Sequence, residues 1–127
     1  MHQYMYATLM TVAAIILSAG FMFFVGAMRG KTKIDSPAMS GHEDLEKALR
    51  IQYNTMEQFV LFVPALWMYA VFVNDLWAGL FGLVWILGRI LYATMYFANP
   101  KRRSIAFALT FFPTIIMTVW AGVAIFF

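Results

Sequence analysis

The chain has 127 residues, of which 63% are hydrophobic and only 12% are charged. A water-soluble domain of this size could not bury so much apolar surface, so the composition predicts a single integral membrane domain over residues 1–127. The formal charge of +3 comes from bases clustered beside apolar segments, a pattern typical of membrane-protein loops, and this argues against nucleic-acid binding.

Four apolar segments predict four membrane-spanning helices, at about residues 4–28, 42–73, 76–98 and 104–126. Each is long enough to cross a hydrocarbon layer of about 30 Å at about 1.5 Å per residue. The first is too long for the apolar part of a signal peptide, so we expect it to be retained. The short connections predict an all-α, up-and-down four-helix bundle.

Small residues recur in the first segment and predict close contacts with a neighbouring helix. They are Ala13, Ala14, Ser18, Ala19, Gly20 and Gly26. In the polar connection that follows, Ser40 lies three residues before Glu43, which predicts a capping box at the start of the second helix. Asn74 and Asp75 predict a tight turn between the second and third helices.

Basic residues occur in the first and third connections and are absent from the chain ends and from the Asn74-Asp75 turn. The positive-inside rule then predicts that both basic connections are cytoplasmic and that both termini lie on the other side of the membrane. Lys101 and Arg102 are interpreted as charges that set this orientation.

Arg50, Asn54 and Glu57 are spaced by four and three residues, so they share one face of the second helix. The helix then continues into almost wholly apolar sequence. Because unpaired charge at that boundary costs at least a few kcal/mol, these side chains need partners from elsewhere in the protein or from a ligand.

The third helix carries a second polar face, made by Arg89, Tyr92 and Tyr96, with Trp85 one turn earlier on the same side. An antiparallel hairpin brings both faces to one depth. This predicts an ion pair between Glu57 and Arg89 and a polar pocket, open to the cytoplasm, for an anionic ligand. The alternative is that the pair fixes helix register alone and the tyrosines anchor the helix at the membrane surface.

No metal site is expected, because His2 and His42 are isolated from any second ligand in the sequence and the chain has no cysteine.

Two motifs carry a family resemblance. The segment Arg50–Glu57 reads R-I-Q-Y-N-T-M-E, and the segment Gly88–Tyr96 reads G-R-I-L-Y-A-T-M-Y, followed by a basic run ending at Arg103-Ser104. Together they resemble the MAPEG family, the membrane-associated proteins in eicosanoid and glutathione metabolism, over nearly the whole chain. Their wording is most similar to the type-three microsomal glutathione transferase branch.

The resemblance implies a homotrimer with one glutathione in each cytoplasm-facing cleft between subunits. Arg103 matches the family's arginine that stabilises the glutathione thiolate, Ser104 is a weaker candidate beside it, and Arg29 matches a base from the adjoining subunit. The remaining positions that match glutathione contacts are Arg50, Gln52, Asn54, Glu57, Tyr92 and Tyr96. Arg89 is left open between ligand contact and structural pairing.

The implied activity is a membrane-bound glutathione transferase, with peroxidase activity also considered, acting on lipophilic electrophiles or hydroperoxides that enter from the bilayer. Glutathione is the implied co-substrate. Gln58 and Tyr92 depart from the leukotriene-forming and prostaglandin-forming branches, which have tyrosine and histidine there, so those activities are not carried over. The alternatives are a small four-helix multidrug exporter and a catalytically silent adaptor. A bacterial inner membrane is the expected location.

Overall fold

The computed structural model describes residues 3–99 and 103–127, without the side chain of Arg103. His2, Lys101 and Arg102 therefore lie outside the described residues. Four helices make up the fold, and no strand occurs in the described ranges. The helices are α1 (Met5–Thr32), α2 (Glu43–Phe72), α3 (Asp75–Ala98) and α4 (Arg103–Ala124).

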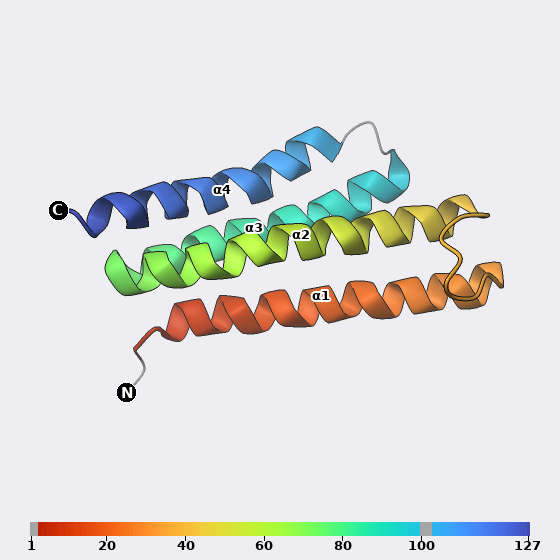
Figure 1. Ribbon diagram of the computed structural model, residues 1–127, viewed down its shortest axis with the longest axis horizontal. Coiled ribbons are helices and arrows are strands. Elements are labelled where there is room, and N and C mark those ends of the chain that lie inside the picture. The colour runs from red at the N-terminus through yellow and green to blue at the C-terminus, as the bar shows by residue number, and fades with distance from the viewer. Residues whose placement is uncertain (1–2, 100–102) are drawn as a thin grey trace.

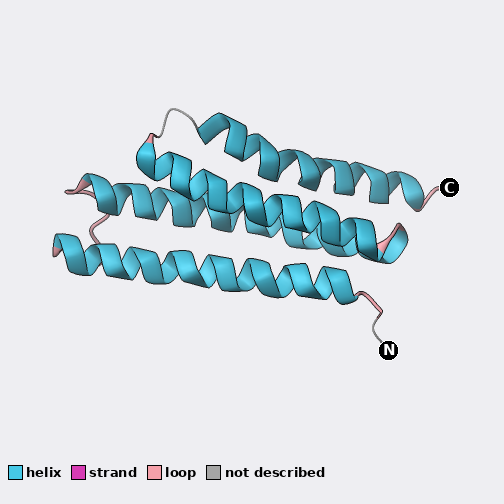
Figure 2. Cartoon of the chain, turned by 180° about the vertical axis from the view of Figure 1, so that it is seen from behind, coloured by secondary structure: helices cyan, strands magenta, loops and turns pink. Residues whose placement is uncertain are grey.

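The helices run up and down in chain order, with α1 and α4 on opposite sides of the central α2–α3 pair (Figures 1 and 2). Both outer helices pack against α2 and α3, and within the described residues they do not contact each other. The predicted all-α four-helix architecture is confirmed by this arrangement.

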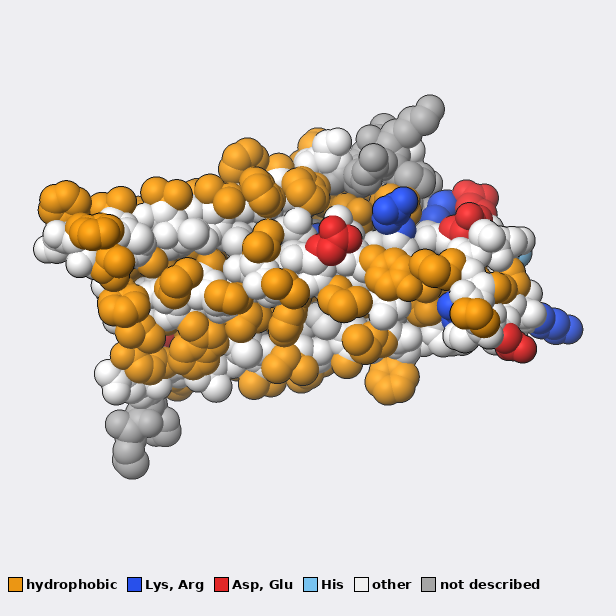
Figure 3. Space-filling view, viewed as in Figure 1, with side chains coloured by type: hydrophobic (Ala, Val, Ile, Leu, Met, Phe, Trp, Pro, Cys, Tyr) orange, Lys and Arg blue, Asp and Glu red, His pale blue; other side chains and the backbone are white. Residues whose placement is uncertain are grey.

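All four helices are long and apolar enough to cross a membrane. Charged side chains gather at the end of the bundle that holds the α1–α2 connection, and apolar side chains cover the long flank (Figure 3). Large side chains such as Ile16 and Phe23 are exposed there. Lipid, or another copy of the chain, must cover this surface, because exposing so large an apolar area to water is unfavourable.

The connection between α1 and α2 differs from the prediction at both ends. Helix α1 continues to Thr32, beyond the predicted end near residue 28, and Lys33 then adopts a left-handed conformation. Helix α2 is capped by His42, whose Nδ1 accepts from the Asp44 backbone N–H at 3.0 Å. The capping box predicted at Ser40 is therefore wrong, because a ring nitrogen next to the first helical residue supplies the acceptor that the helix terminus needs.

The predicted tight turn joins α2 to α3, and Asn74 caps α3 by accepting from the Trp77 N–H at 3.0 Å. The neighbouring Asp75 carboxylate caps a different helix, α1. Its two oxygens accept from the backbone N–H groups of Tyr6, at 3.0 Å, and Ala7, at 2.9 Å. Since α1 has no side-chain cap of its own, Asp75 satisfies two of its orphan donors and places negative charge at its positive end.

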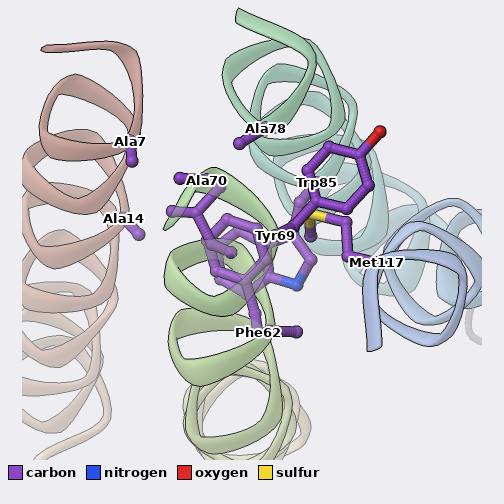
Figure 4. Packing of buried hydrophobic residues seen from close by; sticks show 10 residues of the cluster. Ala7, Ala14, Phe62, Tyr69, Ala70, Ala78, Trp85 and Met117 are labelled. Carbon is purple, nitrogen blue, oxygen red and sulfur yellow. The ribbon is translucent and has the colours of Figure 1, made fainter. Parts of the chain in front are cut away.

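The main core lies between α2 and α3, where Phe62 and Trp85 stack with ring centroids 4.2 Å apart (Figure 4). Close helix approach is provided by α3. A Cβ added at Gly79 would lie 2.7 Å from the Tyr6 Cβ, and one at Gly82 would lie 2.6 Å from the Met10 Cγ. These two glycines therefore allow α1 to pack directly on α3.

The small residues of α1 make the predicted close contacts only in part. Ala14 is fully buried, as expected. At Gly20 and Gly26, in contrast, no atom of another described helix lies within 4 Å of the position that a Cβ would take. The expected close contact is wrong for both glycines within one subunit. Gly20 instead lines an apolar groove of about 530 Å³, together with Ile51 of α2 and Phe97 of α3.

Replacement of Asp75 by Asn should lower the thermal unfolding midpoint in detergent, because it removes the charge that caps α1 and one of the two acceptors. We expect a loss of about 0.5–2 kcal/mol in the free energy of unfolding, the usual worth of a cap. Asp35→Asn is the control, since the Asp35 carboxylate is exposed and has no hydrogen-bond partner in the described ranges. Equal midpoints for the two variants would contradict a capping role.

Candidate functional site

Arg89 is completely buried, and its guanidinium connects three helices. One terminal nitrogen, Nη2, donates to Thr55 Oγ1 on α2 at 2.9 Å, and the other, Nη1, donates to Thr110 Oγ1 on α4 at 3.5 Å. Its central carbon lies 4.4 Å from the ring centroid of Tyr92, the geometry of a cation–π contact. The charged group is therefore held inside the subunit by hydroxyl groups and an aromatic face.

The ion pair predicted between Glu57 and Arg89 is wrong within the subunit. Glu57 is exposed on α2, and it forms no salt bridge with any residue that the structure describes. The residue that meets the guanidinium from α2 is Thr55, two positions earlier. A shift of two residues turns a helical position by about 200°, so Thr55 points into the bundle where Glu57 points out of it.

A cleft of about 320 Å³ opens where α2, α3 and α4 meet, and Asn54, Tyr92, Ser104 and Phe107 line it. We call it the three-helix cleft. The Asn54 side-chain oxygen is buried and has no hydrogen-bond partner among the described residues. The cleft thus combines hydroxyl groups, an aromatic wall and an unpaired amide oxygen.

The aromatic wall of the cleft extends along α3. The rings of Tyr92 and Tyr96 stack with centroids 5.7 Å apart, at an interplanar angle of 22°. Because Arg89 packs on Tyr92, the buried cation, the wall and the cleft form one connected structure. Of the predicted polar face of α3, Trp85, Arg89 and Tyr92 are buried in the bundle, and Tyr96 is partly buried.

Arg50 lies in a second hollow, of about 240 Å³, whose other lining residues are Met39, Glu46, Leu49 and Tyr53. Gln52 points elsewhere, into a mostly apolar groove of about 290 Å³ that includes Ser18 and Met22 of α1. Asn54, Arg50 and Gln52 therefore lie in three different hollows around α2.

Arg29 holds the α1–α2 connection in place. Its Nη1 donates to the backbone oxygens of Ala38, at 2.7 Å, and Ile34, at 3.3 Å. Arg103 begins α4, next to Ser104 at the mouth of the three-helix cleft, but its side chain lies outside the described residues. The position of the Arg103 backbone is therefore known, and its role in stabilising the thiolate stays a prediction.

Thr55, Thr110 and Phe107 were missed by sequence reasoning. The three threonines Thr110, Thr114 and Thr118 recur every four residues in a helix that is otherwise almost wholly apolar. That spacing could have indicated a polar stripe on α4 facing the charged residue of α3. In the structure Thr110 and Thr114 are buried.

No group of three His, Cys, Asp or Glu side chains that could hold a metal ion occurs in the ranges that the structure describes. His42 serves as a helix cap instead.

The model of the MAPEG family matches residues 7–123 of the chain. The chain belongs to the MAPEG family. Together with the four apolar helices, this makes it an integral multi-pass membrane protein. An uncharacterised protein of the cyanobacterium Synechocystis is 38% identical over 123 residues, which cover 97% of this chain and 90% of that protein.

Two relatives of this MAPEG protein have named activities. Human microsomal glutathione S-transferase 2 is 36% identical over 107 residues, or 81% of this chain and 73% of the relative. Bovine leukotriene C4 synthase is 30% identical over 93 residues, or 73% of this chain and 62% of the relative. The resemblance inferred from the two motifs is confirmed at the level of the family, and closeness to the type-three branch stays a prediction.

Replacing Thr55 by Val in this MAPEG protein should cost about 1–3 kcal/mol in the free energy of unfolding, because a buried guanidinium loses its shortest hydrogen bond. Thr118→Val is the matched control, since that hydroxyl is bonded to the carbonyl of its own helix and the residue is exposed. Thermal unfolding in detergent measures both. Equal losses would mean that the Arg89–Thr55 contact contributes little.

Proposed function

We propose that this protein is a membrane-bound glutathione transferase that activates the glutathione thiol and directs it to lipophilic electrophiles or hydroperoxides. The observation that supports this most strongly is the three-helix cleft, in which motif residues Asn54 and Tyr92 meet Ser104 beside the start of α4. Membership of a family whose relatives include a glutathione S-transferase supports the choice of thiol.

The polar groups of the cleft suit a peptide-like ligand. The amide oxygen of Asn54 is buried and has no hydrogen-bond partner among the described residues, and it would accept one from a ligand N–H that enters the cleft. Arg50, in the second hollow, would bind a glutathione carboxylate through its planar fork, as Arg29 would from another subunit. Tyr92 and Tyr96 would form one wall of the site. Arg89, being fully buried, would support that wall and not touch the ligand.

The position of Glu57 supports a site shared between copies of the chain. Helix α2 has 30 residues, and about 20 suffice to cross the hydrocarbon layer, so counting back from Phe72 places Glu57 about one turn inside it. An exposed carboxylate at that depth is costly unless a cation covers it. A neighbouring subunit and the ammonium group of bound glutathione would both supply such cover, in a homotrimer with clefts between subunits.

Gln52 fits the same assembly. It points into the groove between α1 and α2, away from the three-helix cleft of its own subunit. A residue on that face would contact glutathione held mainly by the next copy of the chain.

Arg103 would stabilise the reactive anion. A free thiol is mostly protonated near neutral pH, and a guanidinium fixed beside the sulfur favours the nucleophilic thiolate. Ser104, which lines the cleft mouth, would donate a hydrogen bond to the same sulfur. The second substrate, being lipophilic, would approach from the bilayer along the apolar flank.

The cell membrane in question would be a bacterial inner membrane, in line with the relative in Synechocystis. The basic connections would face the cytoplasm, so the site would open toward cytoplasmic glutathione.

Arg103→Ala should reduce the bound thiolate at least about tenfold, equivalent to a rise of about one unit in the pKa of the glutathione thiol. Stopped-flow ultraviolet absorbance of purified protein mixed with glutathione measures the thiolate directly. Arg102→Ala, the neighbouring base interpreted as setting orientation, is the control and should keep the signal. A wild-type protein without any thiolate signal would favour the silent adaptor, and proton-dependent efflux of a cationic dye would favour the exporter.

Glu57→Gln should weaken glutathione binding at least about tenfold, about 1.4 kcal/mol, because an uncharged amide cannot pair with the ammonium group of the ligand. Equilibrium titration with glutathione in detergent gives the dissociation constant, and Asp35→Asn serves as a control for the loss of one acidic charge. An unchanged affinity in Glu57→Gln would remove Glu57 from the site while leaving the thiolate role of Arg103 to its own test.

A further inference from the structure

Three polar atoms in the interior between α2 and α3 have no hydrogen-bond partner among the described residues. They are Oε1 of Gln58, Nε1 of Trp85 and Nε of Arg89. Gln58 is 5% exposed, and the other two side chains are fully buried. In a membrane-spanning bundle no bulk water reaches such groups, so polar groups there must be satisfied inside the protein.

The three side chains lie on neighbouring turns of the facing helices α2 and α3, and together they form a polar layer in the bundle. On one side, Thr55 bonds Arg89 at 2.9 Å, and on the other, Phe62 stacks on Trp85 with centroids 4.2 Å apart (Figure 4). Gln58 lies one turn from both Thr55 and Phe62 on the buried face of α2, between these two contacts. Trp85 and Arg89 are likewise one turn apart on α3.

We propose that this layer is a binding site for a single internal water molecule. The water accepts hydrogen bonds from the Trp85 indole N–H and the Arg89 Nε–H and donates one to the Gln58 amide oxygen. Two donors and one acceptor match the capacity of a water molecule, and buried waters typically make about three hydrogen bonds. A halide ion would satisfy the two donors but has no proton to give to Gln58.

The site also has a structural consequence for Arg89. With Thr55 and Thr110 on its terminal nitrogens and the water on Nε, every nitrogen of the guanidinium has a partner. The water thereby helps to hold the group against the ring of Tyr92. This inference rests on the interior of the subunit and is independent of the proposed function.

A direct test uses the wild-type protein labelled with ¹⁵N at tryptophan. The indole signal of Trp85, assigned by its disappearance in Trp85→Phe, should show a cross-peak to a long-lived water. The Trp67 indole is the internal control, because it donates to Thr11 Oγ1 at 2.8 Å and needs no water. A Trp85 signal without a water contact overturns the proposal, whether Gln58 bonds the indole directly or nothing does.

A second test compares thermal unfolding midpoints of Gln58→Leu, Trp85→Phe and the double variant. If water links the two groups, Gln58→Leu lowers the midpoint, and the double variant loses clearly less than the sum of the two single losses. Overturning results would be a higher midpoint for Gln58→Leu, which is expected of an unsatisfied amide replaced by an apolar side chain, or strictly additive losses. A wild-type midpoint that rises with chloride concentration would identify a halide and also overturn the proposal.

Discussion

The structure depends on the way it accommodates one buried positive charge. Arg89 has no acidic partner among the described residues, and the hydroxyl groups of Thr55 and Thr110 and the ring of Tyr92 surround it instead. A charge without partners at this depth would be very costly. Because the three partners come from α2, α3 and α4, satisfying the guanidinium fixes the relative positions of these helices. The three-helix cleft lies where the same three helices meet, so their relative positions determine its shape.

Helix α1 is attached by a different mechanism. It packs on α3 through Gly79 and Gly82, bonds Trp67 of α2 through Thr11, and is capped by the Asp75 carboxylate. None of these contacts involves the cleft. Since α1 takes no part in the three-helix cleft of its own chain, the arrangement is compatible with clefts completed between copies of the chain.

Much of the fold could be predicted from sequence, because apolar length, turn residues and basic clusters are local signals. The inward face of α3 also followed from the spacing of Trp85, Arg89 and Tyr92. The partner of Arg89 did not follow, because a carboxylate is the usual partner of a guanidinium and the register between α2 and α3 decides which residue meets it. A two-residue difference in that register separates Thr55 from Glu57. The caps supplied by His42 and Asp75 were missed for a similar reason, since spacing along the chain does not reveal which helix end a side chain reaches.

In this protein, the direction in which a polar side chain points therefore distinguishes a structural role inside the bundle from a binding role on its surface. Thr55 and Arg89 point into the subunit and are satisfied there, so their loss acts first on stability. Arg50 and Glu57 are exposed on α2, Arg50 just outside the hydrocarbon layer and Glu57 about one turn inside it, and neither has an ion-pair partner in the described part of the chain. An uncovered Glu57 carboxylate within a bilayer has a free-energy cost that the contacts of a single chain do not offset. A ligand or a second copy of the chain that pairs with Glu57 removes this cost, which favours a binding role for the outward-facing side chains.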